Sequence, residues 1–178
     1  ESFKYQQGQH LTLRAMIDGE DVRRSYSICS SVQDKLLRVA IKRTPGGLFS
    51  SWANESLQAG ATLEVMPPMG HFNVPLDPAS SRHYLVFASG SGITPILSII
   101  KTTLVAEPHS RFTLFYGNRA SSTVIFRDEL TDLKDTYLER LKIVYVMSRE
   151  QQDIELFNGR ITQDKCEQFL RHWVRIEN

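Results

Sequence analysis

The stretch that decides the fold is Tyr84–Val105, which reads YLVFASGSGITPILSIIKTTLV. Its apolar run over 84–88 predicts a buried strand, and apolar residues recur at helical spacing from Ile96 to Leu104. Between them lies a turn of small residues. Thr94 suits an N-cap and Pro95 suits the first helical position, so the sequence predicts a strand, a glycine turn and a helix.

The glycine turn predicts an anion site, because it places the free backbone N–H groups of a helix N-terminus beyond the end of a strand. Gly90 and Gly92 give that turn its small residues. The turn departs from the dinucleotide fingerprint G-x-G-x-x-G, since Pro95 occupies the last place. The alternative is a plain tight connection, which is the less favoured interpretation of the turn taken alone.

Composition narrows the function classes. The 178 residues are 41% hydrophobic and 23% charged, with a formal net charge of +1. A globular domain or two fits these values, and neither nucleic acid nor a membrane surface is indicated as a partner. No apolar run approaches the roughly 20 residues that span a bilayer, and the N-terminus lacks a signal-peptide core, so we expect a cytoplasmic protein. Cys29 and Cys166 are expected to be unpaired thiols, with no metal site.

The first half reads as short strands and polar turns. Apolar residues alternate over 9–17, which predicts a half-buried strand. Further strands are expected at 22–28, 36–42 and 62–66, and a short helix at 48–57. This arrangement predicts a small antiparallel barrel with one inserted helix.

The strand at 22–28 carries more chemistry than a barrel requires. Strand side chains alternate, so Arg24 and Tyr26 share one face and Ser25 and Ser27 share the other. An exposed polar edge strand is the alternative. A second such place is the turn before the predicted helix, where paired glycines let the backbone approach a ligand and Ser50 can add a hydroxyl to the N–H groups of the first turn.

The second half alternates strands and helices. Strands are expected at 112–116 and 142–147, and helical spacing follows each of them, which predicts a parallel sheet. In such a sheet ligands bind beyond the carboxyl ends of the strands. Arg119 and Arg149 fall at that edge, where an Arg fork can bind phosphate, although each could instead be a solvated surface charge.

Five motifs follow one another along the chain: Arg24-Ser25-Tyr26-Ser27, Gly46-Gly47-Leu48-Phe49-Ser50, Gly70-His71-Phe72, the glycine turn Gly90–Pro95, and Tyr116-Gly117-Asn118-Arg119. Their order resembles the ferredoxin-NADP reductase superfamily over nearly the whole chain. Within it, the chain is most similar to the reductase components of phenylacetyl-CoA oxygenases, through the runs Gly8–Leu13, Thr62–Met66 and Phe112–Arg119.

The resemblance implies an antiparallel FAD-binding β-barrel domain over 1–78 and a parallel-sheet NAD(P)H-binding α/β domain over 79–178. It assigns Arg24 to the flavin phosphates, Tyr26 to the isoalloxazine ring and Ser27 to a hydrogen bond near flavin N5, which makes Tyr26 and Ser27 the candidate catalytic residues. The remaining implied cofactor-binding residues are Ile41, Lys42, Gly47, Leu48, Phe49 and Ser50 for FAD, and Gly90, Gly92, Thr94, Pro95, Asn118, Arg119, Ser148 and Arg149 for the nicotinamide dinucleotide.

Ser148 and Arg149 are similar to the family segment that grips the 2′-phosphate of NADP, which favours NADPH over NADH, although the adjacent Glu150 could weaken that preference. The implied reaction is hydride transfer from nicotinamide C4 to flavin N5, followed by one-electron steps to a ferredoxin-type domain or an oxygenase component. The chain is expected to be a fragment, without the first barrel strand, the C-terminal part and any [2Fe–2S] domain. The alternatives are a reductase of another oxygenase or of a flavohaemoglobin, and a non-catalytic nucleotide-binding module.

Overall fold

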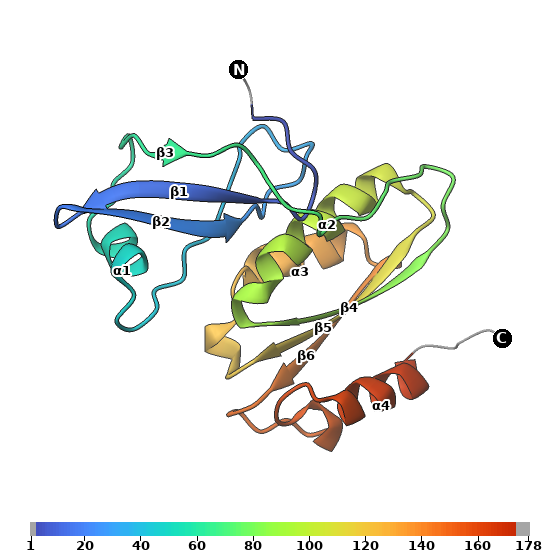
Figure 1. Cartoon of the computed structure of the whole chain (residues 1–178). Coiled ribbons are helices and arrows are strands. Elements are labelled where there is room, and N and C mark those ends of the chain that lie inside the picture. The colour runs from blue at the N-terminus through green and yellow to red at the C-terminus, as the bar shows by residue number, and fades with distance from the viewer. Residues whose placement is uncertain (1–2, 174–178) are drawn as a thin grey trace. The chain divides into compact units, whose positions relative to one another are not determined.

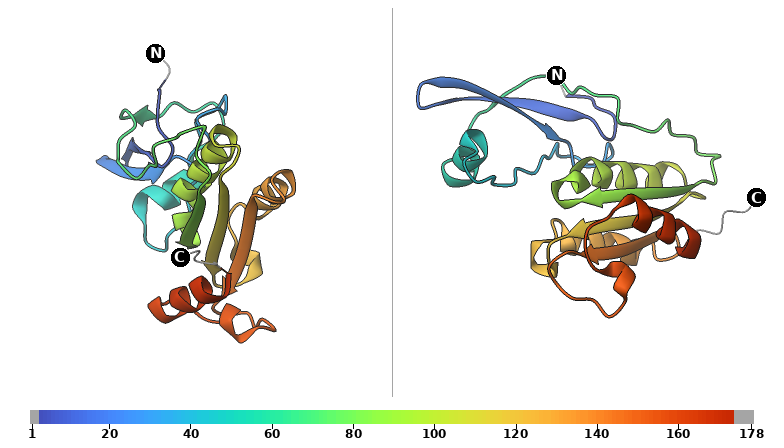
Figure 2. Two further views of the ribbon diagram at one scale, coloured as in Figure 1. Left: turned by 90° about the vertical axis from the view of Figure 1, so that its right-hand side faces the viewer. Right: turned by 60° about the horizontal axis from the view of Figure 1, so that its bottom comes forward.

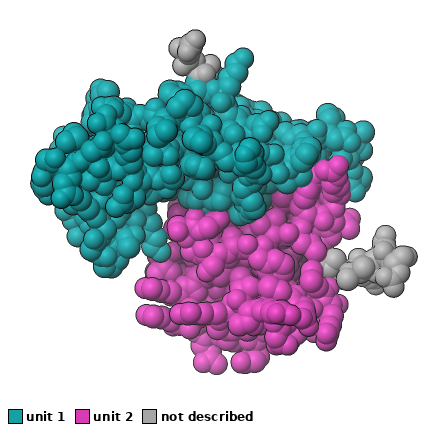
Figure 3. Space-filling model, viewed as in Figure 1, with its two compact units in different colours: residues 1–81, 94–109 teal, residues 82–93, 110–178 magenta. Residues whose placement is uncertain are grey.

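The computed structural model describes residues 3–173. The chain forms two compact units, coloured separately in Figure 3. Unit 1 comprises residues 1–81 and 94–109, and unit 2 comprises residues 82–93 and 110–178. The domain boundary expected between residues 78 and 79 stays a prediction.

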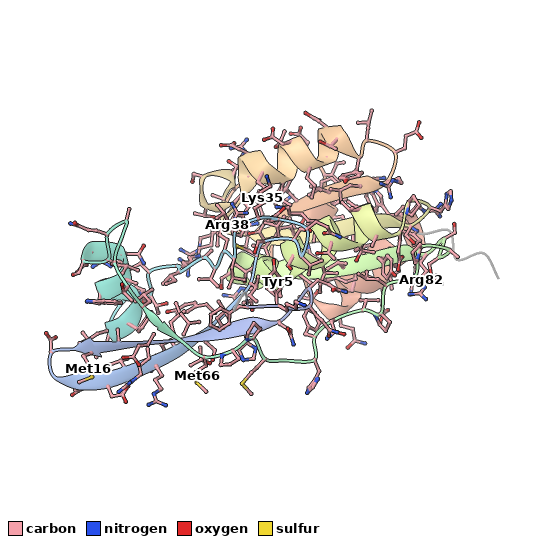
Figure 4. The ribbon with its side chains drawn as sticks, turned by 90° about the horizontal axis from the view of Figure 1, so that it is seen from above. Tyr5, Met16, Lys35, Arg38, Met66 and Arg82 are labelled. Atoms are coloured by element: carbon pink, nitrogen blue, oxygen red, sulfur yellow. The ribbon has the colours of Figure 1, made fainter. Side chains whose placement is uncertain are left out.

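Unit 1 is built on a three-stranded antiparallel sheet in the order β2-β1-β3 (Figure 1). Its strands are β1 (His10–Ile17), β2 (Glu20–Ser27) and β3 (Glu64–Val65). The alternating apolar residues Leu11 and Leu13 are buried on one face, where they pack with Phe49. On the opposite face, Met16 and Met66 point away from the short helix Leu48–Glu55 (Figure 4).

Two expected strands of the first half are shorter than their sequence pattern suggests. The segment 36–42 forms no regular strand and pairs only at Val39, through an isolated bridge to Ile28. Leu36 and Leu37 are 79% and 38% exposed, so no packing fixes them in a ladder. The segment at 62–66 is a strand only over the two residues of β3. The expected helix is α1 (Leu48–Glu55).

The helix after the glycine turn begins earlier than predicted. Gly90–Gly92 already form a 3₁₀ turn, η1, and α2 spans Ile93–Ala106. Thr94 is therefore the second residue of the helix and not its N-cap. Pro95 is the third residue, which costs no hydrogen bond, because the N–H groups of a first turn have no intrahelical acceptor.

Helix α2 is bonded into unit 1. The Ser98 hydroxyl donates to the Ser30 carbonyl at 2.7 Å, and the Lys101 ammonium pairs with Asp34 at 2.7 Å. Ser98 is fully buried, so its hydrogen bond satisfies a polar group that burial would otherwise penalise. These bonds tie α2 to the loop that follows β2.

Unit 2 is a three-stranded parallel sheet in the order β4-β5-β6. The central strand is buried along nearly its whole length, as expected for a parallel sheet that is covered on both faces. The strands are β4 (His83–Ser89), β5 (Arg111–Asn118) and β6 (Leu141–Met147), and the helical elements are η2 (Ser121–Thr123), α3 (Arg127–Thr136), η3 (Glu155–Phe157) and α4 (Gln163–Trp173).

Helix α4 covers one face of this sheet (Figure 2). Phe169 of α4 is fully buried and stacks on Phe115 of β5, with ring centroids 4.5 Å apart. Phe115 in turn stacks on Phe87 of β4 at 4.8 Å. This aromatic column fixes the strands whose carboxyl ends carry the candidate nucleotide residues.

The expected fold class, an antiparallel part followed by a parallel α/β part, is confirmed. In the part of the chain that the structure describes, Cys29 is buried, Cys166 is partly buried, and neither forms a disulfide. Within residues 3–173, no helix has the length and apolar character needed to cross a bilayer.

Candidate functional site

The candidate flavin residues of β2 follow the strand alternation that the sequence predicts. Tyr26 pairs with Leu11 and Arg24 with Leu13, so both side chains lie on the face that carries the core of unit 1. Tyr26 contacts the ring of Phe49 at the start of α1, with centroids 5.7 Å apart. Ser25 lies on the other face, bonded to Thr12 at 2.9 Å. The end of β2 and the start of α1 therefore adjoin.

Arg24 carries an exposed guanidinium at this place. Its Nη1 donates to the carbonyl of Arg23 at 2.7 Å, and Arg24 has no ion-pair partner within residues 3–173. Arg23 differs, because Asp21 pairs with it at 3.1 Å. Burial raises the pKa of Tyr26, so its hydroxyl stays protonated at neutral pH. Arg24 is thus the cation of β2 that is open to an anionic ligand.

The turn before α1 is closed by its own side chains. The Ser50 hydroxyl accepts the Thr44 N–H at 3.1 Å and donates to the Gly47 carbonyl at 3.2 Å. A Cβ on Gly47 would lie 2.6 Å from the Ser50 Oγ and 3.1 Å from the Thr44 oxygen, so glycine is required by packing. The expected role of the Ser50 hydroxyl in anion binding must compete with these two bonds.

The first turn of α1 offers backbone donors instead. No side chain caps this helix, and its first turn holds no acidic residue. The leading N–H groups, those of Leu48 and Phe49, therefore face no carboxylate of their own helix. Phe49 is buried and anchors this first turn in the core of unit 1, whereas Leu48 is exposed to solvent.

Ile41 and Lys42 lie in the extended segment that leads into this turn. The Ile41 carbonyl accepts a hydrogen bond from the Asn54 amide at 3.1 Å, and the Ile41 side chain packs on the core of unit 1. Lys42 is exposed. Unit 1 thus brings together the strand bearing Arg24, an uncapped helix start and a short extended backbone, a donor set that fits a flavin with a pyrophosphate.

The glycine turn of unit 2 is hydrogen-bonded to the side chain of Tyr116, a residue of β5. The buried Tyr116 hydroxyl donates to the Gly90 carbonyl at 2.9 Å. Burial raises the pKa of Tyr116 to about 12. Gly90 has a φ of +51°, which favours glycine, whereas a Cβ on Gly92 would meet no atom within 4 Å. Packing therefore does not require glycine at 92, and open space adjoins it.

The carboxyl ends of β5 and β6 continue as paired backbone beyond the strands. Ser148 N donates to Asn118 O at 2.9 Å, and Arg149 N donates to Arg119 O at 2.8 Å. These bonds bring the backbone of Arg149 next to that of Arg119, the two arginines predicted to lie at this edge. Both are exposed, and neither has an ion-pair partner in the described part of the chain.

Asn118 carries an unsatisfied donor at the same edge. The residue is 8% exposed, and its Nδ2 has no hydrogen bond among residues 3–173, although the side chain is near enough to the Tyr116 hydroxyl to lower the pKa of that group. Buried polar groups are seldom left unpaired, so an unpaired amide at the edge that also carries Arg119 and Arg149 is a reason to place a polar ligand here. Together with the glycine turn, this donor set fits a nucleotide that carries several phosphates.

Glu150 and Ser121 form a contact that sequence reasoning missed. Glu150 Oε2 accepts the Ser121 N–H at 2.7 Å and the Ser121 hydroxyl at 2.8 Å. These bonds hold the pKa of the Glu150 carboxyl below its usual range. The two residues are 29 positions apart, and no local pattern relates them.

The structure places Thr94 and Pro95 in the first turn of α2, which belongs to unit 1, while Gly90 and Gly92 belong to unit 2. Thr94 is buried. Their roles, like those of the other predicted site residues, stay predictions.

Comparison with known proteins identifies two domain families. Residues 1–74 match the oxidoreductase FAD-binding domain, and residues 86–177 match the oxidoreductase NAD-binding domain. The chain is 48% identical over 167 residues to one of the subunits of the 1,2-phenylacetyl-CoA epoxidase of Escherichia coli, a match that covers 94% of this chain and 47% of that protein. It is 41% identical over 148 residues to the ferredoxin reductase component of the 3-ketosteroid-9-alpha-monooxygenase of Rhodococcus rhodochrous, with 82% and 41% coverage.

Among solved structures, the chain is similar to a mutant ferredoxin-NADP+ reductase from Plasmodium falciparum in complex with 2′P-AMP. The TM-score is 0.73 at 25% identity, covering 82% of this chain and 62% of that one. The chain spans about half the length of the curated relatives it matches. With both domain families matched in order, the chain belongs to the FAD- and NAD-binding oxidoreductases of the ferredoxin-NADP reductase family.

Proposed function

We propose that the whole protein is an NADPH-dependent flavoprotein reductase that passes electrons to an iron–sulfur acceptor, a ferredoxin-type domain or an oxygenase component. Phenylacetyl-CoA oxygenase is the proposed system, supported by the 48% identity to the Escherichia coli protein. We further propose that the flavin-binding domain ends near residue 78 and that the nucleotide-binding domain follows it.

The observation that carries this proposal is the paired backbone of residues 118–119 and 148–149. It brings together the backbones of two exposed arginines, whose side chains have no carboxylate partner within residues 3–173. An Arg fork binds phosphate in bidentate fashion, and a serine hydroxyl at the same place adds a donor. A pair of uncompensated arginines at the carboxyl edge of a parallel sheet favours a 2′-phosphorylated nucleotide over its unphosphorylated counterpart.

In unit 1, we propose that Arg24 binds the flavin phosphates together with the first N–H groups of α1. Tyr26 would orient the isoalloxazine, since Phe49 holds its ring. Ser27 would donate or accept a hydrogen bond near flavin N5. When bound, FAD supplies the redox chemistry that links a two-electron nicotinamide donor to one-electron acceptors.

We propose that the turn Gly90–Gly92 of unit 2, with Thr94 and Pro95 that follow it directly in the chain, binds the nicotinamide half of the dinucleotide. Asn118 would contribute its unpaired Nδ2. Arg119, Ser148 and Arg149 would bind the phosphate on the adenosine ribose. The Plasmodium reductase solved with 2′P-AMP supports a phosphorylated ribose as the ligand class.

The test is made on the full-length protein. It is expected to be purified with a flavin spectrum that bleaches on addition of NADPH. Arg149→Ala should raise the KM for NADPH roughly ten-fold or more while changing that for NADH little, because one charge-assisted phosphate contact contributes about 1.5–3 kcal/mol. Arg171→Ala is the matched control, since Arg171 is an exposed arginine of α4 paired with Glu167. Equal effects of Arg149→Ala on both nucleotides would refute the 2′-phosphate assignment.

A second candidate is the reductase of another oxygenase or the reductase part of a flavohaemoglobin. The Rhodococcus component favours the first of these, and a flavohemoprotein of Candida albicans is 29% identical over 169 residues. Reconstitution with a phenylacetyl-CoA oxygenase component decides between them, because the proposed system predicts NADPH oxidation that depends on phenylacetyl-CoA. Full-length protein that binds no flavin would instead support a nucleotide-binding module.

A further inference from the structure

Glu150 places a negative charge next to the arginine that is assigned to the 2′-phosphate. A free carboxylate at this position would repel a phosphate, and it could also neutralise Arg149 or Arg119 by forming an ion pair. Neither event occurs in the structure. No ion pair joins Glu150 to either arginine in the described part of the chain.

The Glu150 carboxylate is instead bound at the start of η2. One oxygen, Oε2, accepts both the backbone N–H and the hydroxyl of Ser121, at 2.7 and 2.8 Å. The N–H distance is as short as that of charge-assisted hydrogen bonds, and the hydroxyl distance is that of an ordinary O–H···O hydrogen bond. The other oxygen, Oε1, lies 3.5 Å from Gln152 Nε2, and Arg127 adds a smaller charge attraction, so the carboxylate is held without using Arg119 or Arg149.

The surrounding backbone makes this arrangement specific. Ser148 and Arg149 are hydrogen-bonded to Asn118 and Arg119, which fixes the loop after β6 against the loop after β5. Glu150 directly follows Arg149 in the loop after β6, and Ser121 lies two residues beyond Arg119 in the loop after β5. The contact between the two loops therefore continues from their backbones to the Glu150 carboxylate and Ser121. The low pKa of the Glu150 carboxyl that follows from these bonds keeps the group ionised and bound at neutral pH.

We propose that Ser121 is a positioning residue that sets nucleotide specificity: by binding the Glu150 carboxylate, it leaves Arg119 and Arg149 free for a 2′-phosphate. This inference rests on the proposed NADPH-dependent function and adds its determinant. The position of Glu150 beside Arg149 in the sequence alone suggests a weaker preference for NADPH. While the Ser121 hydroxyl is present, Glu150 does not weaken that preference.

The experiment measures the binding of two ligands that differ only in the 2′-phosphate, 2′,5′-ADP and 5′-AMP, by titration calorimetry on the full-length flavoprotein. Ser121→Ala removes the hydroxyl bond and should weaken 2′,5′-ADP roughly two- to five-fold, the effect of one partly exposed charge, with 5′-AMP unchanged. Adding Glu150→Gln to Ser121→Ala should restore the affinity for 2′,5′-ADP.

Two matched controls accompany these variants. Ser122→Ala alters the neighbouring exposed serine of η2, whose hydroxyl forms no side-chain bond within residues 3–173, and it should change neither affinity. Asp153→Asn in the Ser121→Ala background removes an exposed carboxylate of the same loop and should not restore binding.

Several outcomes overturn the inference. An equal loss for both ligands in Ser121→Ala would mean that the serine only maintains the loop. An unchanged affinity ratio, or a loss that Glu150→Gln does not reverse, would equally overturn it. If the wild-type protein binds 2′,5′-ADP and 5′-AMP equally, the proposed NADPH preference fails as well, which distinguishes the two failures.

Discussion

Tyr116→Phe tests whether the hydrogen bond from the Tyr116 hydroxyl keeps the glycine turn ordered. The substitution deletes one oxygen and retains the ring, which packs near Tyr145 with centroids 6.1 Å apart. It removes the 2.9 Å hydrogen bond from the Tyr116 hydroxyl to the Gly90 carbonyl. It also removes the contacts of this hydroxyl with the Ile125 backbone and the Asn118 side chain, which partly offset the effect of burial on its pKa.

The expected loss can be worked out from the groups that remain. The Gly90 carbonyl also accepts the N–H of Ile93, so it does not become an orphaned acceptor when Tyr116 loses its hydroxyl. The cost of this bond should then be that of one ordinary net hydrogen bond, about 1 kcal/mol, and the contacts with Ile125 and Asn118 set an upper limit of roughly 2 kcal/mol. Each kcal/mol lost lowers Tm by about 2–4 °C in a chain of 150–250 residues.

The same loss should appear in nucleotide binding. If the turn must be ordered to receive the dinucleotide, a variant that orders it less well binds more weakly, by at most about five-fold for each kcal/mol. The assay is thermal unfolding followed by circular dichroism, together with the Kd for NADP+ by calorimetry. Tyr145→Phe is the matched control, because the Tyr145 hydroxyl has no hydrogen bond in the described part of the chain.

The reasoning would be refuted by a Tyr116→Phe variant that unfolds and binds like Tyr145→Phe. A normal Tm with weakened NADP+ binding would still support the role of the Tyr116–Gly90 hydrogen bond in ordering the turn, since the turn can be locally disordered without loss of the whole fold. A lowered Tm with unchanged binding would show that the bond is structural and that the turn is ordered by other contacts.

Three further predictions concern the glycine turn and the turn before α1. Gly92→Ala should leave Tm unchanged or slightly raised, because its Cβ meets no atom within 4 Å, but should weaken NADP+ binding measured by calorimetry if a ligand fills that space. Gly47→Ala should lower stability by roughly 1–3 kcal/mol through overpacking against Ser50 and Thr44, and flavin content by absorbance should fall with it. Because the pKa of Tyr116 is about 12 when folded and about 10 when unfolded, its contribution is complete below pH 10 and is lost as the pH rises to 12. Burial also raises the pKa of Tyr145, so urea unfolding across that range should show a slope of stability with pH that is smaller in Tyr116→Phe but not absent.

Local periodicity was sufficient where one face of a strand is buried. Leu11 and Leu13 alternate with polar residues, and the structure buries both of them in β1. The same alternation at 36–42 gave a wrong prediction, because Leu36 and Leu37 remain exposed and only Val39 finds a partner. A pattern of period two indicates that a strand is possible, whereas pairing requires a neighbour that the sequence does not specify.

The glycine turn shows a different limit. Ser, Thr and Pro signals placed the N-cap at Thr94, one residue after the observed start of the helix at Ile93. Those signals describe how isolated helix ends are capped. Here Gly90–Gly92 already wind as a 3₁₀ turn, and the Tyr116 hydroxyl from a neighbouring strand holds its first carbonyl. Tertiary contact, and not a local cap, determines how the chain enters α2.

Glu150 shows most clearly why a site cannot be read from residue types in order. In the sequence it stands beside Arg149 and counts against a phosphate ligand. In the structure its charge is bound by Ser121, a residue 29 positions earlier that carries no motif of its own. Its effect on specificity therefore depends on two donors of Ser121, the backbone N–H and the hydroxyl, which reach it because the loops after β5 and β6 are paired through their backbones. Related chains that keep the arginine but lose the serine should, by this reasoning, discriminate less well between phosphorylated and unphosphorylated nucleotides.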